Sequence, residues 1–500
     1  MILFLLLVTL PIVSLYILLK NRAAKALTPP GPPGLPLIGH LHQLSTSTNL
    51  HEFLWQLSKK YGPIMYLKLG SVPLVVISSA KLAKEVLKTH DNVFCSRPKF
   101  VGQQKLSYDG LDIAFSPYSD YWRELRKITT LHLFSQKKVQ SFSPIREDEI
   151  SRLVAKISSF ASTSQVLNLN ETMTSFTSTL ICRVAFGERY DEEGSKRRRF
   201  DELLREAQAM MASFFISDYF PGFSWVDKLS GLMSQLEKTF KRLDEFYQEL
   251  IDEHLDFDRR NTAENDDDGD ILDVLIRLKE GRSCSIDLNW ENIKGLLMNI
   301  FIGGTETIAA AVIWTMTILV TRPNMMEKVQ AQIRELVGRK GKLNEDDLQK
   351  LSYLRAVINE ALRLYPPLPL LLPRTATEKC MVEGYEVLPK TLVYVNMWAI
   401  ARDPKYWENP DEFLPERFLH ENIDVRGQEF GMIPFGSGRR VCPGIFMGLA
   451  TVGVTIANLL YYFDWELPHG VTPQDIDMDV LPGLAAHKKN ALYLIPRKHI

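Results

Sequence analysis

The residues best placed to do chemistry lie in one short segment near the C-terminus, PFGSGRRVCPG, residues 434–444. Its cysteine, Cys442, follows Arg439 and Arg440 and precedes Pro443, a residue suited to the first turn of a helix. Neighbouring cations and a helix N-terminus both lower the pKa of a thiol, which favours the thiolate form. A thiolate is a good ligand for a soft metal ion. We therefore interpret this segment as a candidate metal-binding loop.

The same segment has two other interpretations. A buried free cysteine in a loop is common. Gly436 and Gly438 fit the start of a dinucleotide-binding loop, but the third glycine of that pattern is replaced by Val441 and the strand-helix context is missing. No histidine or second cysteine lies nearby to complete a metal site made of protein ligands alone. A metal with one protein ligand needs a macrocycle for its other positions, which points to haem with an axial thiolate.

A second polar group interrupts an apolar helical pattern. The run GGTET, residues 303–307, lies inside a predicted helix from residue 296 to residue 320. Each glycine costs such a helix about 1 kcal/mol relative to alanine, so the run is locally unfavourable. One interpretation is a kink without function, and the other is a widened turn that presents Glu306 and Thr307 to a ligand. The haem loop favours the second interpretation.

Together these motifs resemble those of the cytochrome P-450 family. The family's haem loop, Phe-x-x-Gly-x-Arg-x-Cys-x-Gly, is matched by Phe435, Gly438, Arg440, Cys442 and Gly444. Further matches follow in the expected order: a proline-rich segment (27–40), WRELR (122–126), FIGGTET (301–307), EALR (360–363) and PERF (415–418). The chain looks like a plant microsomal A-type haem-thiolate monooxygenase, closest to the group that includes aldoxime-oxidising enzymes. It departs from the pattern at Gly303, where alanine is usual, and at Ile308, where a hydroxyl residue is common.

The resemblance implies a role for each matched residue around a haem b. Cys442 would ligate the iron, and Phe435, Gly438 and Gly444 would shape the loop that holds the cofactor. The haem propionates would find their partners in Trp122, Arg126, Arg374 and Arg440. A buried triad supporting the haem loop would consist of Glu360, Arg363 and Arg417.

The resemblance also implies the reacting side of the site. Glu306 and Thr307, with water, would deliver the protons that oxygen activation needs. The substrate pocket would be apolar and would include Leu297, Phe301, Gly303, Leu368, Leu370, Leu372 and Leu484. Such a pocket is expected to take a small apolar or aromatic compound of plant specialised metabolism.

The rest of the sequence sets the frame for this site. The chain has 500 residues, a formal net charge of -1 and five widely spaced cysteines, so neither nucleic-acid binding nor a disulfide scaffold is expected. Helical periodicity marks residues 200–254, 287–320, 324–337 and 352–365, and alternating patterns mark strands at 64–69 and 73–78. The predicted fold class is mainly α with a minor β-sheet domain, which the resemblance makes the cytochrome P-450 fold with an N-terminal transmembrane helix.

The N-terminus differs from the rest of the chain. Residues 1–19 carry no charge, and a helix of that length spans about 29 Å, close to the thickness of a bilayer core. Lys20, Arg22 and Lys25 then place the following chain on the cytosolic side. We expect a transmembrane signal anchor at 1–20, a basic and proline-rich hinge at 21–49 and a haem-thiolate catalytic domain at 50–500. A cleaved signal peptide is the alternative interpretation.

These observations predict a single-pass protein of the endoplasmic reticulum membrane with its catalytic domain in the cytosol. No flavin or dinucleotide motif is present, so electrons from NADPH must come through a separate reductase, with cytochrome b5 as a second electron donor. The expected activity is a monooxygenase reaction, typically hydroxylation. A haem-thiolate isomerase or dehydratase that needs neither oxygen nor reductase is the alternative, and a non-catalytic haem sensor is a third class. Glu306 and Thr307 argue against both.

Overall fold

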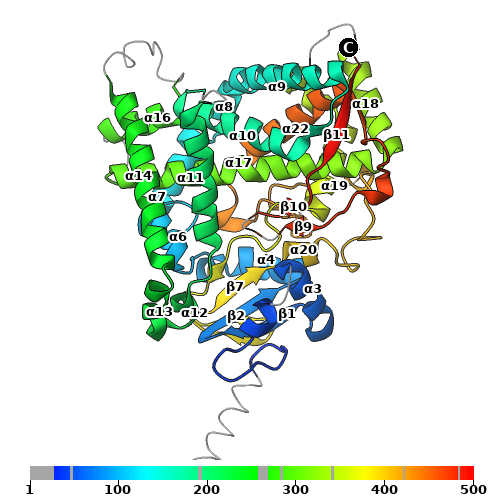
Figure 1. Cartoon of the computed structure of the whole chain (residues 1–500). Helices are drawn as coiled ribbons and strands as arrows, with labels where there is room; N and C mark the ends of the chain where they lie inside the picture. Colours follow the sequence, from blue (N-terminus) through cyan, green and yellow to red (C-terminus); the bar gives the residue numbers. More distant parts are fainter. Residues whose placement is uncertain are drawn as a thin grey trace, which may run out of the picture.

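The computed structural model of the chain describes residues 27–45, 49–189, 194–256, 269–281, 285–338, 343–420, 423–481, 483 and 485–499. The predicted membrane anchor, residues 1–20, lies outside these ranges. Within them, a large helical part lies beside a smaller part built around a β-sheet (Figure 1). The predicted fold class, mainly α with a minor sheet, is confirmed.

The longest helix, α17 (Trp290–Val320), runs through the middle of the helical part (Figure 1). It is apolar on nearly all sides, as expected of a helix surrounded by protein. The helices α10 (Leu169–Phe186), α19 (Ser352–Leu364) and α22 (Ile445–Tyr462) pack against it. Two described helices, α17 and α22, are long and apolar enough to cross a membrane, but 67% and 72% of their most apolar stretches are buried in the protein. They are therefore core helices.

Longer helices surround this core and shorter ones fill the connections. The longer ones are α3 (Leu50–Tyr61), α9 (Ser143–Thr163), α11 (Ser195–Ala212), α14 (Leu232–Leu255), α16 (Ile271–Glu280) and α18 (Pro323–Val337). The shorter ones are α2 (Leu41–Ser45), α4 (Ala80–Lys84), α5 (Asp91–Phe94), α6 (Val101–Leu106), α7 (Asp120–Ile128), α8 (Gln136–Ser141), α20 (Met397–Ile400) and α21 (Arg417–His420).

One predicted helical range is wrong in its middle. Residues 200–254 form two long helices rather than one, because α11 ends at Ala212 and α14 begins at Leu232. Two short helices, α12 (Ile216–Tyr219) and α13 (Ser224–Leu229), fill the gap. The chain turns extended at Ser213, directly after α11, and Pro221 and Gly231, at φ 80°, then prevent one continuous helix up to the start of α14. The other three predicted helices match α17, α18 and α19 within a few residues.

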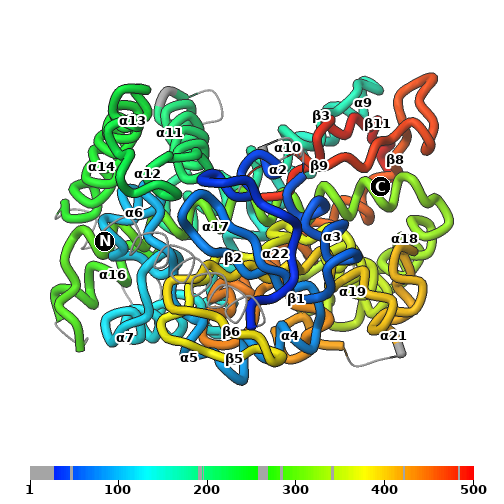
Figure 2. Tube along the Cα trace, turned by 90° about the horizontal axis from the view of Figure 1, so that it is seen from below, coloured from blue at the N-terminus to red at the C-terminus, as the bar shows by residue number. Residues whose placement is uncertain are grey.

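The main sheet has four strands in the order β1-β2-β7-β4. β1 (Ile64–Leu69) and β2 (Val72–Ile77) form the predicted hairpin, β7 (Leu392–Val395) runs parallel to β2, and β4 (Arg374–Thr375) closes the sheet. Figure 2 shows this sheet from below, with α17 and α22 behind it. The small sheets use β3 (Leu167–Asn168), β5 (Cys380–Val382), β6 (Tyr385–Val387), β8 (Phe463–Glu466), β9 (Val480–Leu481), β10 (His487–Lys488) and β11 (Tyr493–Lys498).

The proline-rich segment lies along β1 rather than apart from the sheet. The Tyr66 amide donates to the Pro30 carbonyl at 2.9 Å, and the His40 amide donates to the Lys68 carbonyl at 2.7 Å. A Cβ atom on Gly31 would lie 2.0 Å from the Tyr66 carbonyl oxygen, so a glycine is required where the proline-rich segment contacts β1. From residue 27 onward the chain is thus fixed to the sheet.

Candidate active site

The cysteine loop is held in a conformation that only its glycines permit. Gly436 and Gly438 have φ angles of 72° and 70°, in the left-handed region that favours glycine. A Cβ atom on Gly438 would lie 2.1 Å from the Leu87 carbonyl oxygen, so this turn also packs tightly on its neighbour. The Cys442 amide donates to the Phe435 carbonyl at 2.9 Å, which closes the loop just before α22.

The electrostatic setting of the Cys442 thiol differs from the expectation. Burial raises the pKa of Cys442, while the Gly444 N–H and the Arg126 guanidinium oppose that rise. The predicted role of Arg439 and Arg440 is therefore wrong. Arg439 instead pairs with Asp91 at 3.0 Å, and Arg440 points to backbone carbonyls. Thiolate stabilisation comes from a cation on α7 and from a backbone amide of the loop itself, rather than from the side chains of the two arginines in the motif.

A cavity of about 290 Å³ lies over this thiol. Its walls come from α7, α10, α17, α22 and the loops before β4 and α22. Most lining residues are apolar or glycine, and Cys442, Phe435 and Gly444 lie on its surface. Thr307, from α17, lines the same cavity. The structure thus brings the predicted metal ligand and the predicted alcohol to one chamber.

Four arginines border the cavity, and we call them the arginine cluster: Arg97, Arg126, Arg374 and Arg440. Arg440 donates to the carbonyls of Cys95, Ile113 and Ser116, and its guanidinium lies 4.0 Å from the ring centre of Trp122. The Trp122 indole donates to the Ile113 carbonyl at 2.9 Å. Arg374 contacts Asp91 at 3.4 Å and the Ser437 carbonyl at 3.2 Å.

Sequence reasoning missed Arg97. Its side chain is buried and donates to the carbonyls of Ala114, Leu372 and Pro373 at 2.9, 2.8 and 2.8 Å. These bonds tie together two loops that border the cavity. Arg97 follows α5 in an irregular segment, and nothing in its spacing to other residues marks it. A buried arginine can be found only once the fold places it.

The arginine cluster fits the two carboxylates of a haem. Burial lowers the pKa of all four members: to about 9 for Arg440 and well below the usual range for Arg97. Like-charge neighbours lower the pKa of Arg440 and Arg97 further. Among the described residues that line the cavity there is no aspartate or glutamate. Asp91 partly compensates Arg374, but it does not line the chamber, and several buried cations facing one chamber are destabilising unless an anionic ligand compensates them.

The adjacent glycines Gly303 and Gly304 of α17 lie in different surroundings. A Cβ atom on Gly303 would meet nothing within 4 Å, because Gly303 faces the cavity. A Cβ atom on Gly304 would lie 2.6 Å from the Cδ1 atom of Ile181, so this glycine lets α10 approach α17 closely. The Thr307 hydroxyl donates to the Gly303 carbonyl at 2.5 Å. The hydroxyl proton of Thr307 is thus used within the helix, and the oxygen can still accept a hydrogen bond from a group in the cavity.

The acid of the predicted pair, Glu306, faces another way. It does not line the cavity, and its Oε2 atom lies 3.1 Å from the Nε2 atom of His487 on β10. The structure thus separates the alcohol, which lines the chamber, from the acid, which contacts the C-terminal sheet. The histidine partner was not expected from the sequence.

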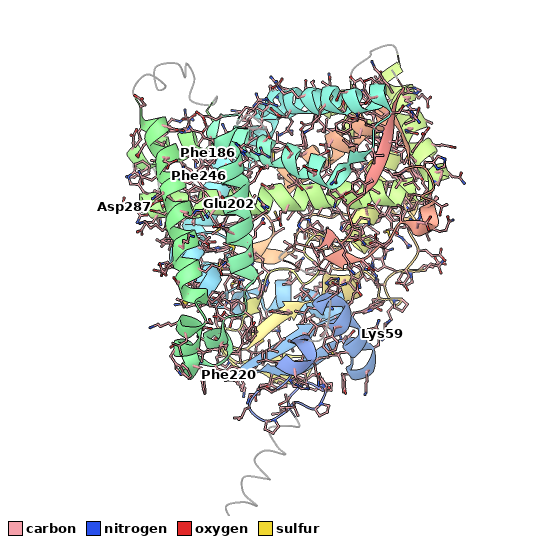
Figure 3. The ribbon with its side chains drawn as sticks, in the orientation of Figure 1. Lys59, Phe186, Glu202, Phe220, Phe246 and Asp287 are labelled. Carbon is pink, nitrogen blue, oxygen red and sulfur yellow. The ribbon has the colours of Figure 1, made fainter. Side chains whose placement is uncertain are left out.

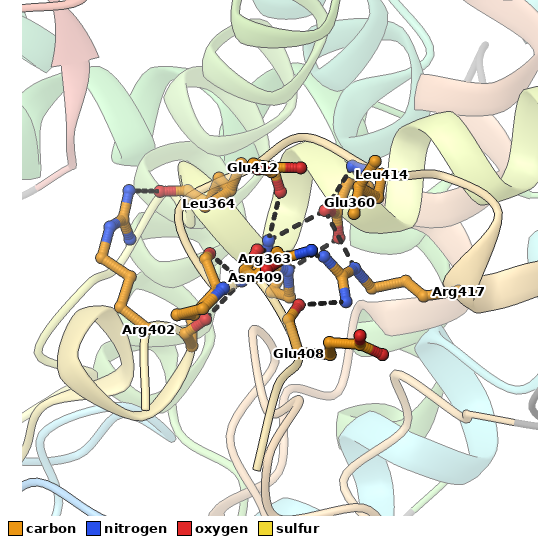
Figure 4. A network of polar contacts seen from close by, with 11 residues as sticks. Glu360, Arg363, Leu364, Arg402, Glu408, Asn409, Glu412, Leu414 and Arg417 are labelled. Carbon is orange, nitrogen blue, oxygen red and sulfur yellow. Dashed lines mark hydrogen bonds and ion pairs between the residues drawn. The ribbon is translucent and has the colours of Figure 1, made fainter. Parts of the chain in front are cut away.

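The predicted triad is assembled, with Glu360 and Arg363 fully buried and Arg417 partly accessible (Figure 4). The Glu360 carboxylate accepts from Arg363 at 2.7 and 2.8 Å and from Arg417 at 3.2 Å. Arg363 also donates to the carbonyls of Ala401, Pro410 and Glu412, and Arg417 donates to that of Glu408. These hydrogen bonds therefore hold the segment 401–414 rather than the cysteine loop itself.

The triad reaches the cysteine loop through that segment. Within it, the Tyr406 hydroxyl donates to Glu429 at 3.3 Å, and its ring occupies the space where a side chain on Gly431 would lie. Residues 427–437 then lead into the loop, where the Ser437 hydroxyl donates to the Gly427 carbonyl at 2.6 Å. Support of the haem loop is thus indirect.

The predicted pocket residues divide into three groups. Gly303, Leu368 and Leu372 line the cavity over Cys442, whereas Leu370 lines a neighbouring cavity of about 270 Å³ beside β9. Leu297 and Phe301 do not line either cavity, so this part of the prediction is wrong. Phe301 packs in the core, with ring centres 4.7 Å from Phe186, which Figure 3 labels. Leu484 lies outside the described residues.

A mainly helical protein that places one cysteine thiol at an apolar chamber bordered by arginines has the construction of a haem-thiolate enzyme. The family model described as cytochrome P-450 matches residues 29–495, and the chain belongs to this family. The family and fold imply haem b, electrons from a redox partner and a monooxygenase activity. The relatives place the chain among the plant A-type members.

Two curated relatives cover almost the whole chain. A 6,7,8-trihydroxycoumarin synthase of Pastinaca sativa is 50% identical over 98% of this chain and 97% of its own length. A 5-OH-xanthotoxin synthase of the same plant is also 50% identical, over the same shares. A solved zebra fish cytochrome P-450 with progesterone is 24% identical, covers 90% of this chain and 100% of its own, and has a TM-score of 0.78, which shows the shared fold. Kinship with the aldoxime-oxidising group stays a prediction.

Proposed function

We propose that this protein hydroxylates a small aromatic compound of the coumarin type. The observation that carries this proposal is the single chamber that holds Cys442, Thr307 and the arginine cluster. The chamber's lining is otherwise almost entirely apolar, which suits a flat aromatic substrate with few charges. The two relatives named for hydroxylated coumarin products support the choice of substrate class.

The residues of the chain would divide the work as follows. Cys442 would hold the iron as a thiolate, with Arg126 and the Gly444 N–H stabilising its charge. The arginine cluster would bind the propionates and fix the plane of the cofactor. When bound, haem supplies oxygen activation and the transfer of one oxygen atom to the substrate, and the second atom leaves as water. Thr307, oriented by its bond to Gly303, would accept a hydrogen bond inside the chamber and position a proton-carrying water there.

The proposal includes a membrane anchor and outside electron donors. Residues 1–20 would span the membrane of the endoplasmic reticulum once, and the catalytic domain, residues 50–500, would lie in the cytosol. The predicted hinge at 21–49 would bend only before residue 27, because the described part after that residue is fixed to the sheet. An NADPH-dependent flavin reductase would deliver electrons, with cytochrome b5 as a second donor.

Removing residues 1–26 should keep the haem spectrum and release the protein from microsomes. Recovery of a natural chain that starts near residue 27 would contradict the anchor.

The experiment that tests the activity uses the full chain with reductase, NADPH and simple coumarins. Binding is followed as a shift of the Soret band, and turnover as product, NADPH consumed and hydrogen peroxide. Thr307→Ala should lower product per NADPH by about tenfold or more and raise peroxide, because the water that Thr307 positions is the proton donor and such a donor commonly contributes about 10²–10⁴-fold. Thr307→Ser, which keeps the hydroxyl, is the matched control and should stay near wild type.

The outcomes distinguish the competing activities. Oxygen- and NADPH-dependent hydroxylation supports the proposal. Turnover that needs neither oxygen nor NADPH would replace it with the isomerase or dehydratase activity. Normal coupling in a folded Thr307→Ala protein would show that the hydroxyl is structural.

A further inference from the structure

Glu306 has a built partner on a distant part of the chain. Its Oε2 atom lies 3.1 Å from the Nε2 atom of His487, which is 181 residues further along. About a quarter of each side chain is accessible, 24% for Glu306 and 25% for His487. Among the described residues, no other charged group is in hydrogen-bond or ion-pair contact with either of them. The pair therefore lies between the chamber-lining helix and water.

The backbone around His487 is fixed from several sides. The Trp314 indole donates to the Ala486 carbonyl at 2.9 Å, and the Ala486 amide donates to the Pro367 carbonyl at 2.8 Å. On the other side, the buried Lys488 ammonium donates to the Asp477 carboxylate at 2.8 Å and to the Asn490 carbonyl at 2.9 Å. These bonds hold β10 against α17, so the imidazole is presented to Glu306 by a rigid frame.

We propose that His487 is a proton-relay residue that supplies Glu306. This inference rests on the proposed function, in which Thr307 positions a proton-carrying water, and on the role of Glu306 as its acid partner that the family resemblance implies. An imidazole can take up a proton at Nδ1 from water and release another from Nε2, so one ring moves a proton between its two sides. The proton released from Nε2 would bind the Glu306 carboxylate, and the ring would return to its starting tautomer by exchange with water. No electrons are transferred in this step.

The position of Glu306 makes such a relay useful. Glu306 lies beside Thr307 in sequence but outside the lining of the chamber, so its carboxyl group is loaded from one side of α17 and used on the other. Each hydroxylation consumes protons that must come from the solvent. Both side chains are about a quarter accessible, so His487 gives this carboxylate a hydrogen-bonded route for protons from solvent in addition to its own exposed edge. His487 acts through Glu306 and does not touch the substrate.

The test compares three substitutions in the full-length protein with its reductase. His487→Gln keeps an N–H donor near Glu306 but cannot relay a proton, and His487→Phe removes both properties. His499→Gln is the matched control, because His499 lies 3.5 Å from Asp464 in a histidine–carboxylate pair that does not border the chamber. We expect product per NADPH to fall about tenfold in both His487 variants, with a matching rise in peroxide, and to be unchanged in the control.

A second readout does not depend on turnover. In ferric protein labelled at histidine carbons, the His487 signal is assigned as the one lost in His487→Gln. Its chemical shift should change in Glu306→Gln, because the Nε2 atom of His487 lies 3.1 Å from the Glu306 carboxylate. Wild-type coupling in His487→Gln would reduce His487 to a hydrogen-bond donor and overturn the relay. An unchanged His487 signal in Glu306→Gln would overturn it as well, because the relay requires this contact.

The same experiments separate this inference from the proposed function. If Glu306→Gln and Thr307→Ala both stay fully coupled, proton delivery by this helix fails, and the relay fails with it. If these two variants are uncoupled while both His487 variants behave as wild type, only the relay is refuted.

Discussion

Replacing Gly303 and Gly304 by alanine, one at a time, should move the stability of the protein in different directions. Both residues lie inside α17, so each alanine gains about 1 kcal/mol of helix propensity. A methyl group on Gly303 enters open space in the chamber. A methyl group on Gly304 would meet Ile181 at 2.6 and 3.0 Å, closer than carbon atoms approach each other. Overpacking of this kind costs about 1–3 kcal/mol.

These magnitudes set the expected results. Gly303→Ala should stabilise the protein by about 1 kcal/mol, whereas Gly304→Ala should range from neutral to about 2 kcal/mol destabilising. Shortening the clashing side chain with Ile181→Val removes Cδ1, the nearer of the two contacts. In that background the penalty of Gly304→Ala should shrink markedly, while the gain from Gly303→Ala should stay the same.

The measurement is the urea midpoint at which the red-shifted Soret band of the reduced carbon-monoxide complex is lost. A double-mutant cycle between residues 181 and 304 should show a coupling of about 0.5–3 kcal/mol, and the cycle between 181 and 303 should show none. Gly303→Ala should in addition weaken binding of bulky coumarins, because its methyl group takes chamber volume. Equal effects of the two alanines, or a coupling near zero at 304, would refute the account of close helix packing.

Three further predictions concern buried polar groups. Arg97→Lys should lower haem content and speed haem transfer to apomyoglobin, because one ammonium cannot replace a guanidinium that bonds three carbonyls. Glu360→Gln should cost about 3–5 kcal/mol by leaving Arg363 without its buried counter-charge, seen as loss of the carbon-monoxide band on expression. Asp112→Asn should destabilise the protein by about 1–3 kcal/mol in thermal unfolding at pH ~7, since its amide would face the Asn299 amide that now donates to Asp112 at 2.8 Å. Burial raises the pKa of Asp112 from 3.8 to about 6. As the pH falls from 6 towards 3.8, the folded wild type therefore binds a proton at Asp112, which relieves the free-energy cost of the buried carboxylate. Near pH ~5 the free energy of unfolding of the wild type should consequently rise relative to that of the variant.

The sequence was most informative where chemistry depends on local spacing. The cysteine loop needs its glycines at fixed offsets from Cys442, and the Glu360–Arg363 pair lies three residues apart on one helix, so both could be recognised from letters alone. The start of α17 carries a similar local signal, because Asn289 and Asn292 form a capping box there. These features are determined within one turn or one loop.

Which side chains of α17 line the cavity could not be predicted from local spacing. Residues 296, 300, 303, 304, 307, 308 and 311 line the chamber and follow helical spacing. Leu297 and Phe301 share their own face, but an offset of one residue turns a side chain by about 100° and points it into the core. Both faces are apolar, so composition does not distinguish core from pocket. Only the packing of α10 and α22 against α17 decides which stripe meets the cavity.

Arg97 and His487 were missed for a related reason. Each acts across a long stretch of chain, Arg97 on carbonyls near residue 372 and His487 on Glu306. Lone arginines and histidines carry no spacing signal, and their role exists only after distant segments meet. The pKa of Cys442 could not be predicted from neighbouring residues either, since the cation that lowers it is Arg126, which lies far away in the sequence, and not the adjacent arginines.

The parallel pairing of β2 with β7 has a consequence for how the protein is made. β2 ends at Ile77, but its partner begins at Leu392, so the ribosome must add roughly 300 further residues before the pair can form. At about 5–20 residues per second the apolar edge of β2 stays unpaired for roughly 15–60 seconds. An exposed apolar strand edge is a template for wrong partners, including the same strand on a neighbouring nascent chain. The yield of functional protein should therefore depend on chaperones and on slow, well-spaced translation, and a chain that terminates before residue 392 should aggregate even though its first hairpin is complete.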